Sequence, residues 1–308
     1  MTVIIETERL TKRYKNFYAV QDVSLTIRKG EIYGFIGLNG AGKTTTIRML
    51  LGMIQPSRGS CYIKGERVSR TNHHLWKHVG HLVETPHSYP ELTVKENLEL
   101  FHRLRRILEQ DTVSNVLNLL NLTRYADTKA GELSLGNAQR LGIAKALLHS
   151  PEILILDEPF NGLDPAGMMQ MRELLQSLAY EQGVTILVSS HLLSEVAKIT
   201  FKIGIIHDGQ LLQEITADEL KQLLRQRLII ATRHIEAASA VLSAAGFHPT
   251  LNKSGELEIY NDDAVQHPDQ VARLLVEKDH PPTRLVVEEE NLESYFLQLV
   301  KNEGRGSS

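Results

Sequence analysis

A glycine-rich segment that ends in lysine and threonine is the first part of the chain that could do chemistry. Residues 37–44 read Gly-Leu-Asn-Gly-Ala-Gly-Lys-Thr and fit the pattern G-x-x-x-x-G-K-[ST]. Glycines let the backbone wrap around a polyphosphate, and a helix that begins at the loop adds the positive end of its dipole. We expect Lys43 to reach the β- and γ-phosphates of a nucleotide and the Thr44 hydroxyl to ligate Mg²⁺. The other loop contacts are expected from Asn39, Gly40, Ala41, Gly42 and Thr45.

Two acids that follow an apolar run are the second chemical feature. Residues 153–156 are Ile-Leu-Ile-Leu, and they lead into Asp157, Glu158 and Pro159. Ligands of open α/β sheets bind beyond the carboxyl ends of the strands, so both acids would lie beside the phosphate loop. Asp157 could hold Mg²⁺ there, and Glu158 could polarise a water for attack on the γ-phosphate. A solvated acidic turn is the alternative, and the matching phosphate loop upstream argues against it.

A stretch of small and polar residues lies between these two features. Residues 133–140 read Leu-Ser-Leu-Gly-Asn-Ala-Gln-Arg. Ser134 can cap a helix and offer its hydroxyl to a phosphate, and Gly136 permits close approach of the backbone. Because the chain already has a phosphate loop, we interpret this stretch as a helix start that reaches a nucleotide held by another copy of the fold.

The elements that must position these residues alternate between strands and helices. Short apolar or alternating runs predict strands at 3–5, 23–27, 32–36, 79–83, 153–156 and 185–188, and a hairpin at 59–68. A helix is predicted at 44–53, after the phosphate loop. Between 92 and 148 the pattern is helical, with one apolar face made of Val94, Leu98, Phe101, Leu104 and Leu108 and another of Val113, Val116, Leu117 and Leu120. Apolar strands alternating with helices indicate an α/β fold.

A change of pattern near residues 217–227 marks a domain boundary. The charged segment 218–227 predicts a linker helix after a first domain at 1–217. Beyond it, strands at 228–230, 257–260 and 284–287 and helices at 235–245, 271–276 and 291–300 are expected. This order resembles a βαββαβ unit with one extra helix and predicts a small α+β accessory domain at 228–303. Residues 304–308 are expected to form a flexible tail.

Bulk properties narrow the class of protein. The 308 residues suffice for one large domain and a smaller one. The net charge of −3 provides no basic field, so we expect no nucleic-acid partner. The one cysteine, Cys61, excludes an internal disulfide and fits a reducing cytosol. No apolar run reaches the roughly 20 residues that cross a bilayer, and the start lacks a basic secretion signal, so a membrane role must come through a partner.

The phosphate loop, the 133–140 stretch and the acidic strand end occur in the order that is typical of the nucleotide-binding subunits of ABC transporters. The chain resembles that family over residues 1–217. The resemblance implies a P-loop NTPase with a RecA-like core, an antiparallel β subdomain and a helical subdomain at about 86–150. It also implies that Tyr14 stacks on adenine, that Asp164 belongs to a D-loop of sequence Asn-Gly-Leu-Asp, and that His191 contacts the γ-phosphate.

The same resemblance implies an ATPase that uses ATP and Mg²⁺ and forms a homodimer when ATP binds. Ser134 and Gly136 of one copy would complete the site of the other. Integral membrane permease subunits would be the further partners, and the protein would lie in the cytoplasm, peripheral on the inner face of the cell membrane. The outline of the C-terminal unit resembles bacitracin-resistance and lantibiotic-immunity exporters, which implies export of a peptide antibiotic or another drug.

Two rival functions are weighed against export. One is a soluble ABC-class ATPase that acts on nucleic acid or ribosomes, and the single phosphate loop and the lack of sustained heptads argue against it. The other is a nucleotide-binding switch without turnover, and the presence of Glu158 and His191 argues against that.

Two positions depart from the family pattern. The signature is usually Leu-Ser-Gly-Gly-Gln, and here Leu135 stands at the first glycine, so its side chain should face away from phosphate. Glu84, after the strand at 79–83, stands where the family has a glutamine that ligates Mg²⁺. Glutamate would also ligate the metal, and its charge near Asp157 and Glu158 would favour protonation unless the metal compensates. We hypothesise that Glu84 takes part in catalysis and couples metal binding to the helical region; a solvated loop position is the alternative.

Two further features are expected to be structural. The histidines His73, His74, His78, His81 and His87 form a dense cluster, but a strand at 79–83 would make their rings diverge, so a metal site is disfavoured. We expect the cluster to border the Glu84 loop and to face water or a partner. The apolar faces between 94 and 120 are interpreted as core of the helical subdomain, with part of their surface open to a helix of a membrane partner.

Overall fold

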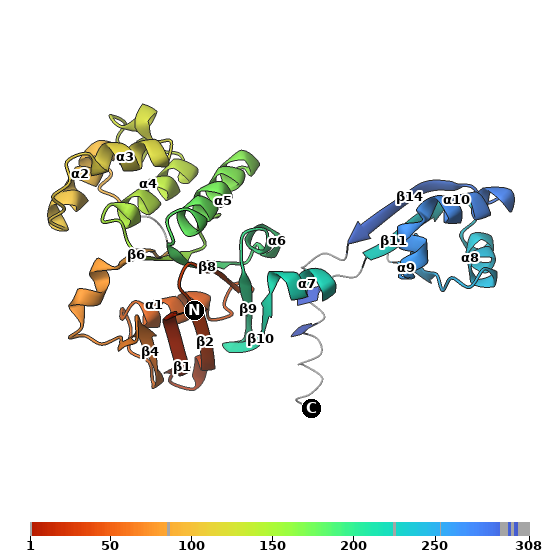
Figure 1. Cartoon of the computed structure of the whole chain (residues 1–308), viewed down its shortest axis with the longest axis horizontal. Helices are drawn as coiled ribbons and strands as arrows, with labels where there is room; N and C mark the ends of the chain where they lie inside the picture. The colour runs from red at the N-terminus through yellow and green to blue at the C-terminus, as the bar shows by residue number, and fades with distance from the viewer. Residues whose placement is uncertain are drawn as a thin grey trace. The chain divides into compact units, whose positions relative to one another are not determined.

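The computed structural model describes residues 2–84, 87–223, 226–252 and 254–289, together with 295–296 and 299–300. The chain divides into two compact units, Met1–Ala217 and Asp218–Ser308 (Figure 1). Among the described residues, the first unit contains two sheets and the second contains one, and each unit has its own apolar core. Within the described residues, no helix is long and apolar enough to cross a bilayer.

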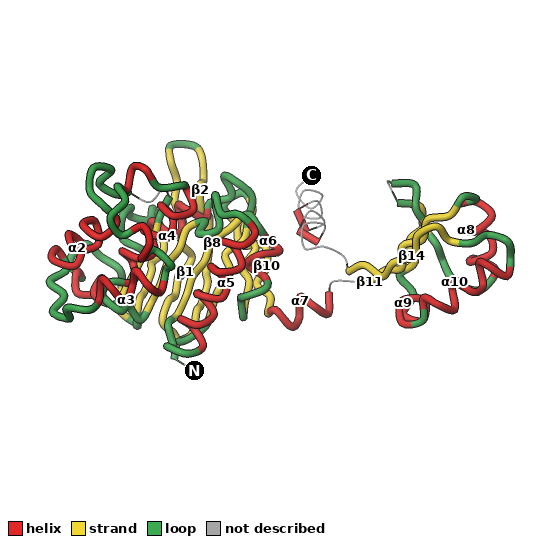
Figure 2. The backbone as a smooth tube through the Cα atoms, turned by 90° about the horizontal axis from the view of Figure 1, so that it is seen from above, coloured by secondary structure: helices red, strands yellow, loops and turns green. Residues whose placement is uncertain are grey.

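A six-stranded sheet in the first unit carries both the phosphate loop and the acidic strand end. In the described part of the chain its order is β10-β9-β3-β8-β7-β6, with bounds β3 Ile32–Ile36, β6 Val79–Leu82, β7 Ile153–Asp157, β8 Thr185–Ser190, β9 Lys202–His207 and β10 Gln210–Thr216. Strands of this sheet, among them β8 and β10, are drawn in yellow in Figure 2. Neighbours from β9 to β6 are parallel, and β3, β7 and β8 are buried along their whole length. The predicted α/β sheet is therefore confirmed, and the carboxyl ends of these strands lie at one edge.

A second, antiparallel sheet packs near the first. Its order is β2-β1-β4-β5, with bounds β1 Val3–Tyr14, β2 Phe17–Arg28, β4 Arg58–Ile63 and β5 Glu66–Arg67. The strands predicted at 3–5 and 23–27 are only parts of much longer strands. The sequence pattern underestimates their length because register shifts along β1 and β2 interrupt the alternation of apolar and polar residues on which the prediction relies. Helix α1, Lys43–Leu50, shares one apolar core with both sheets, through Ile5, Ile47 and Ile155 among others.

The region between residues 92 and 148 is helical, as predicted. It contains α2 Val94–Leu104, α3 Thr112–Leu119 and α4 Leu135–Leu147, with short 3-10 turns at Thr123–Tyr125 and Ala130–Glu132. A capping box between Thr93 and Glu96 starts α2. The predicted apolar face of α3 is buried, but Leu104 and Leu108 on the other face are 66% and 89% exposed. That part of the prediction is wrong because α2 ends at Leu104 and the chain turns at Arg106 with a positive φ.

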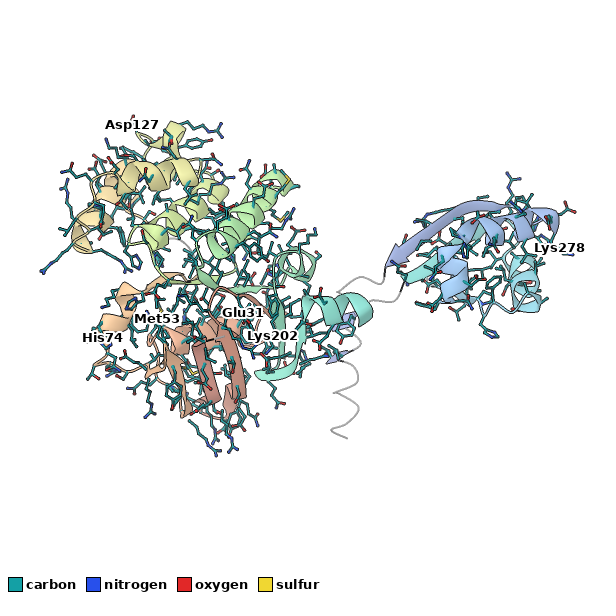
Figure 3. The ribbon with its side chains drawn as sticks, viewed as in Figure 1. Glu31, Met53, His74, Asp127, Lys202 and Lys278 are labelled. Atoms are coloured by element: carbon teal, nitrogen blue, oxygen red, sulfur yellow. The ribbon has the colours of Figure 1, made fainter. Side chains whose placement is uncertain are left out.

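Helices follow the strands that end at the site. Helix α5, Pro165–Tyr180, follows β7, and α6, Leu193–Ala197, follows β8. A 3-10 helix at His73–Lys77 precedes β6 and holds part of the histidine cluster. His74 bonds Glu66 at the surface, where Figure 3 labels it, and His78 bonds Glu152, each at 2.7 Å. The prediction that the histidine cluster faces solvent is wrong for His81. This residue is half-buried on β6, and burial lowers its pKa.

The second unit is a small α+β fold, as predicted. Its sheet has the order β12-β13-β11-β14 and is antiparallel throughout. The elements are α7 Ala217–Leu223, β11 Gln226–Thr232, α8 Ile235–Ala244, β12 Thr250–Leu251, β13 Leu257–Ile259, α9 Asp262–Gln266, α10 Pro268–Glu277 and β14 Pro282–Glu289. Leu228, Ile230, Leu242, Leu257 and Leu275 belong to its core.

The linker helix predicted at 218–227 is shorter, because Gln226 and Arg227 pair with β14 and belong to β11. Most of the helix predicted at 291–300 and all of the tail predicted at 304–308 lie outside the described residues.

Candidate nucleotide site

The phosphate loop connects β3 to α1 and contains positions that accept only glycine. Gly40 and Gly42 have φ angles of 84° and 108°. A Cβ atom at Gly42 would lie 2.5 Å from the carbonyl oxygen of Ala19, and one at Gly37 would lie 2.4 Å from that of Ile206. The loop therefore wraps tightly at the start of α1, where backbone N–H groups and the helix dipole favour an anion.

The ammonium of Lys43 is buried where the loop meets the acidic strand end. Its Nζ donates to the carbonyl oxygens of Gly37 at 2.6 Å and Leu38 at 3.2 Å. It also forms an ion pair with Glu158 Oε1 at 3.1 Å. One positive charge is thus held within reach of both the loop and the carboxylate that the sequence predicts to be catalytic.

Glu158 directly follows β7 and has a left-handed backbone with φ 53°, a conformation that non-glycine residues seldom adopt. Its N–H donates to the carbonyl oxygen of Ser189 at 3.1 Å and to the Ser189 hydroxyl at 3.2 Å, and these bonds hold the turn. Carboxylate oxygen Oε2 lies 2.8 Å from His191 Nδ1 and accepts the His191 N–H at 3.3 Å. The carboxylate therefore bridges Lys43 and His191.

Asp157 is the buried end of β7, 2% exposed, and its two oxygens have different partners. Oδ2 accepts a hydrogen bond from the Thr44 hydroxyl at 2.7 Å, and Oδ1 accepts one from the Ser189 hydroxyl. Thr44 and Asp157, two of the three predicted metal ligands, are therefore neighbours. A carboxylate beside a hydroxyl oxygen is the donor chemistry that Mg²⁺ prefers, so these residues fit that ion.

A cavity of about 230 Å³ lies beside the phosphate loop. Its lining comprises Phe17, Ala19, residues 39–45 and Glu158. Tyr14, the aromatic named from the resemblance, does not line this cavity but pairs with Phe17 across the β1–β2 hairpin. Phe17 is 63% exposed and Tyr14 48%. Sequence reasoning missed Phe17, and the signal that could have found it was a second aromatic three residues further along the hairpin.

The 133–140 stretch forms the start of α4, as predicted. Ser134 is the N-cap and accepts the Asn137 N–H, and Asp164 is the N-cap of α5 and accepts the Gly167 N–H at 2.8 Å. Ser134, Gly136 and Asp164 line one cavity of about 850 Å³, which is separate from the cavity at the phosphate loop. Within one chain these residues are therefore not brought to the site of Lys43.

Glu84 lies at the end of β6 with a φ of 60° and is about half-exposed. Its carboxylate pairs with the guanidinium of Arg48 on α1. In the described part of the chain, no hydrogen bond or ion pair joins Glu84 to Asp157 or Glu158. The expected crowding of three carboxylates is thus replaced by an ion pair with α1, and the role of Glu84 in metal binding and catalysis stays a prediction.

Besides Phe17, two more residues at the site were not anticipated from the sequence. Ser189 holds both Asp157 and the Glu158 backbone, and Gln139 on α4 donates from Nε2 to the Glu158 carbonyl oxygen at 3.3 Å. Ser189 directly follows the strand predicted at 185–188 and lies in the last part of β8, just before Ser190 and His191. The position of Ser189 at a strand end, beside a predicted site histidine, could have identified it from the sequence. No sequence feature pointed to Gln139.

A P-loop ATPase is the class of protein that this fold and this site define. The family model described as "ABC transporter" matches residues 20–161. The bacitracin transport ATP-binding protein BcrA of Bacillus licheniformis is 40% identical over 302 residues, covering 97% of this chain and 98% of that protein. The lantibiotic transport ATP-binding protein SrtF of Streptococcus pyogenes is 35% identical over 233 residues, covering 75% of this chain and 100% of that protein.

Solved structures agree with these relatives. An ATP-binding subunit of an ABC transporter has a TM-score of 0.64 at 30% identity and covers 71% of this chain and 92% of its own. A dimeric ATP-binding cassette in a post-hydrolysis state with ADP and Pi has a TM-score of 0.64 at 27% identity, covering 70% and 99%. The chain belongs to the ATP-binding subunits of ABC transporters, and it binds and hydrolyses ATP. The family and the ATPase activity predicted from the sequence are therefore confirmed.

Proposed function

We propose that this protein is the ATPase that energises export of a peptide antibiotic or related drug through separate integral membrane permease subunits. The observation that carries the proposal is the full-length likeness to a bacitracin transport protein, which extends through the second unit as well as the first. The lantibiotic transport relative supports the same class of cargo. Among the described residues, no feature of the site favours the rival role on nucleic acid or ribosomes, and the transport names of the relatives argue against it.

The chemistry at the phosphate loop follows from the groups that meet there. Lys43 would turn its ammonium to the β- and γ-phosphates, where it offsets charge that develops in the transition state. Glu158 would accept a proton from the attacking water, and His191, already bonded to that carboxylate, would fix its direction and face the γ-phosphate. Thr44 and Asp157 would hold Mg²⁺, which supplies Lewis-acid polarisation of the phosphate oxygens when bound.

Binding of the base and ribose would use the hairpin and the loop. The exposed rings of Tyr14, at the end of β1, and Phe17, at the start of β2, offer apolar faces, and Phe17 lines the loop cavity. The backbone of residues 39–45 would bind the phosphates.

A second copy of the chain would complete each site. Ser134, Gly136 and Asp164 line a cavity of their own, so they are free to meet the nucleotide of a partner copy. A homodimer that closes on ATP and opens after hydrolysis would move two permease subunits relative to one another. Together with those permeases, the protein would act at the inner face of the cell membrane, in the cytoplasm.

Co-purification and susceptibility would test this function together. The chain, tagged and extracted from membranes, should bring down integral membrane proteins encoded by neighbouring genes. A strain that carries Glu158→Gln should become more susceptible to at least one cell-wall-active peptide antibiotic, whereas Glu173→Gln, an exposed position on α5, should not. Unchanged susceptibility of the Glu158→Gln strain to all such peptides would remove the antibiotic-export proposal.

A further inference from the structure

Leu135 is an exposed apolar side chain in a cavity lined mainly by polar groups. It is the first residue of α4 and is 57% exposed, next to the Ser134 cap. Its exposed side chain does not simply point into solvent. A Cβ atom built at Gly162 would lie 2.2 Å from Leu135 Cδ2 and 2.5 Å from its Cγ. The leucine therefore occupies the space beside Gly162 that any larger residue would need.

A second contact joins the same two segments. A Cβ atom at Gly136 would lie 3.2 Å from Leu163 Cδ2 and 3.6 Å from the Gly162 carbonyl oxygen. The starts of α4 and α5, which can be followed in Figure 1, thus meet through consecutive residues on each side. Because both segments line the 850 Å³ cavity, they form one packed surface.

This surface connects to the catalytic carboxylate of the same chain. Gly162 lies in the turn that begins at Glu158, where the Asn161 N–H donates to the Glu158 carbonyl oxygen at 3.1 Å. Gln139, one turn further along α4, donates to that same oxygen at 3.3 Å. A displacement at the start of α4 is therefore transmitted to the Glu158 backbone by two short routes.

We propose that Leu135 is a positioning residue that couples the start of α4 to Glu158 of the same chain through its contact with Gly162. ATP that engages Ser134 and Gly136 then sets the geometry of the hydrolytic carboxylate in the chain that contributes those residues. This coupling rests on the proposed ATP-bound homodimer, and it links the two ATP sites of that dimer. A smaller residue at position 135 would leave the two segments free to move separately.

A double-mutant cycle between Leu135→Ala and Gly162→Ala tests the contact. Gly162→Ala should lower kcat about tenfold or more, while the affinity for a fluorescent ATP analogue changes less than about twofold. In the Leu135→Ala background the same change should have little effect, because Cγ and Cδ2 are gone. Gly183→Ala is the matched control, since Gly183 has a similar φ of 69° but no atom within 4 Å of the added Cβ, and it should leave kcat unchanged.

The single variant Leu135→Ala gives a measurement that a purely structural packing role of Leu135 would leave unchanged. It should lower kcat about threefold to tenfold and reduce the Hill coefficient for ATP toward 1, with the melting temperature little changed. This single variant decides the matter if Gly162→Ala does not fold. Equal effects of Gly162→Ala with and without Leu135, or an unaltered kcat and Hill coefficient in Leu135→Ala, would overturn the coupling.

Light scattering of the Glu158→Gln protein with ATP separates this inference from the proposed function. If that protein forms no dimer, the dimeric site itself fails. If the dimer forms and the mutant cycle is additive, only the coupling through Leu135 fails.

Discussion

The carboxylate of Glu158 has two basic neighbours, and this arrangement defines the site at the scale of single residues. Lys43 lies 3.1 Å from one oxygen and His191 2.8 Å from the other. A left-handed backbone, held by Ser189, turns the side chain out of the strand direction. The strained turn is thus stabilised by its surroundings and aims the carboxylate at the mouth of the loop.

Substitution of that carboxylate should separate ATP binding from hydrolysis. Glu158→Gln removes the proton acceptor but preserves shape, so kcat should fall by about 10²–10⁴ while ATP still binds. Steady-state ATPase assays and equilibrium binding of a fluorescent ATP analogue measure the two effects. Glu173→Gln serves as the control, and a variant that retains more than a tenth of the parental kcat would exclude Glu158 as the general base.

Glu84 is the residue whose chemistry differs most from the family pattern. Glu84→Gln should raise the Mg²⁺ concentration for half-maximal ATPase activity about threefold or more, because a charged oxygen ligand becomes a neutral one. It should change the free energy of unfolding by less than about 1 kcal/mol, since the ion pair with Arg48 is exposed. Arg48→Gln, which removes only the pair, is the control. An unchanged Mg²⁺ dependence and unchanged transport coupling would reject the hypothesis.

Helix α4 links three parts of the candidate site at the scale of the element. Its start presents Ser134, its middle holds the Glu158 backbone through Gln139, and Lys145 near its end donates to the His87 carbonyl oxygen and to Ser88 at 2.7 Å. Burial lowers the pKa of Lys145 to about 8. One helix therefore contacts both the turn at Glu158 and a segment that follows Glu84 in the sequence.

His149, just beyond α4, should make stability depend on pH. Burial and, second, the charge of Arg105 lower its pKa to about 4, and its Nε2 bonds the Val79 carbonyl oxygen at 3.1 Å. An unfolded histidine titrates near 6.5, so the stabilisation from the neutral ring is complete above that pH and is lost as the pH falls toward 4. The free energy of unfolding of the parent, relative to His149→Gln, should fall by about 1–3 kcal/mol between pH 7 and pH 4. Urea denaturation at several pH values measures it, and a constant difference would contradict the assignment.

The whole chain consists of two compact units. All residues of the candidate ATP site belong to Met1–Ala217, and the second unit has its own sheet and core. We propose that the domain boundary lies near residue 217, with α7 as the connector and an accessory domain that begins at β11.

Truncation tests that boundary. A chain of residues 1–217 should fold and retain ATP binding and basal hydrolysis within about threefold of the full chain, because no site residue is removed. Circular dichroism and ATPase assays measure this, with Glu158→Gln in the same truncation as the background control. Aggregation or loss of ATP binding would show that the second unit is part of the stable fold.

The sequence alone determined the features that depend on neighbours along the chain. The phosphate loop, the apolar strands that end in Asp157 or precede His191, and the cap of α4 are local patterns, so their residue types and spacing were sufficient. Only the tertiary structure decided which distant residues meet: Phe17 at the loop cavity, Arg48 with Glu84, and Leu135 against Gly162. Those contacts depend on which elements pack against one another, and a local periodicity indicates the buried face of an element but not its neighbour.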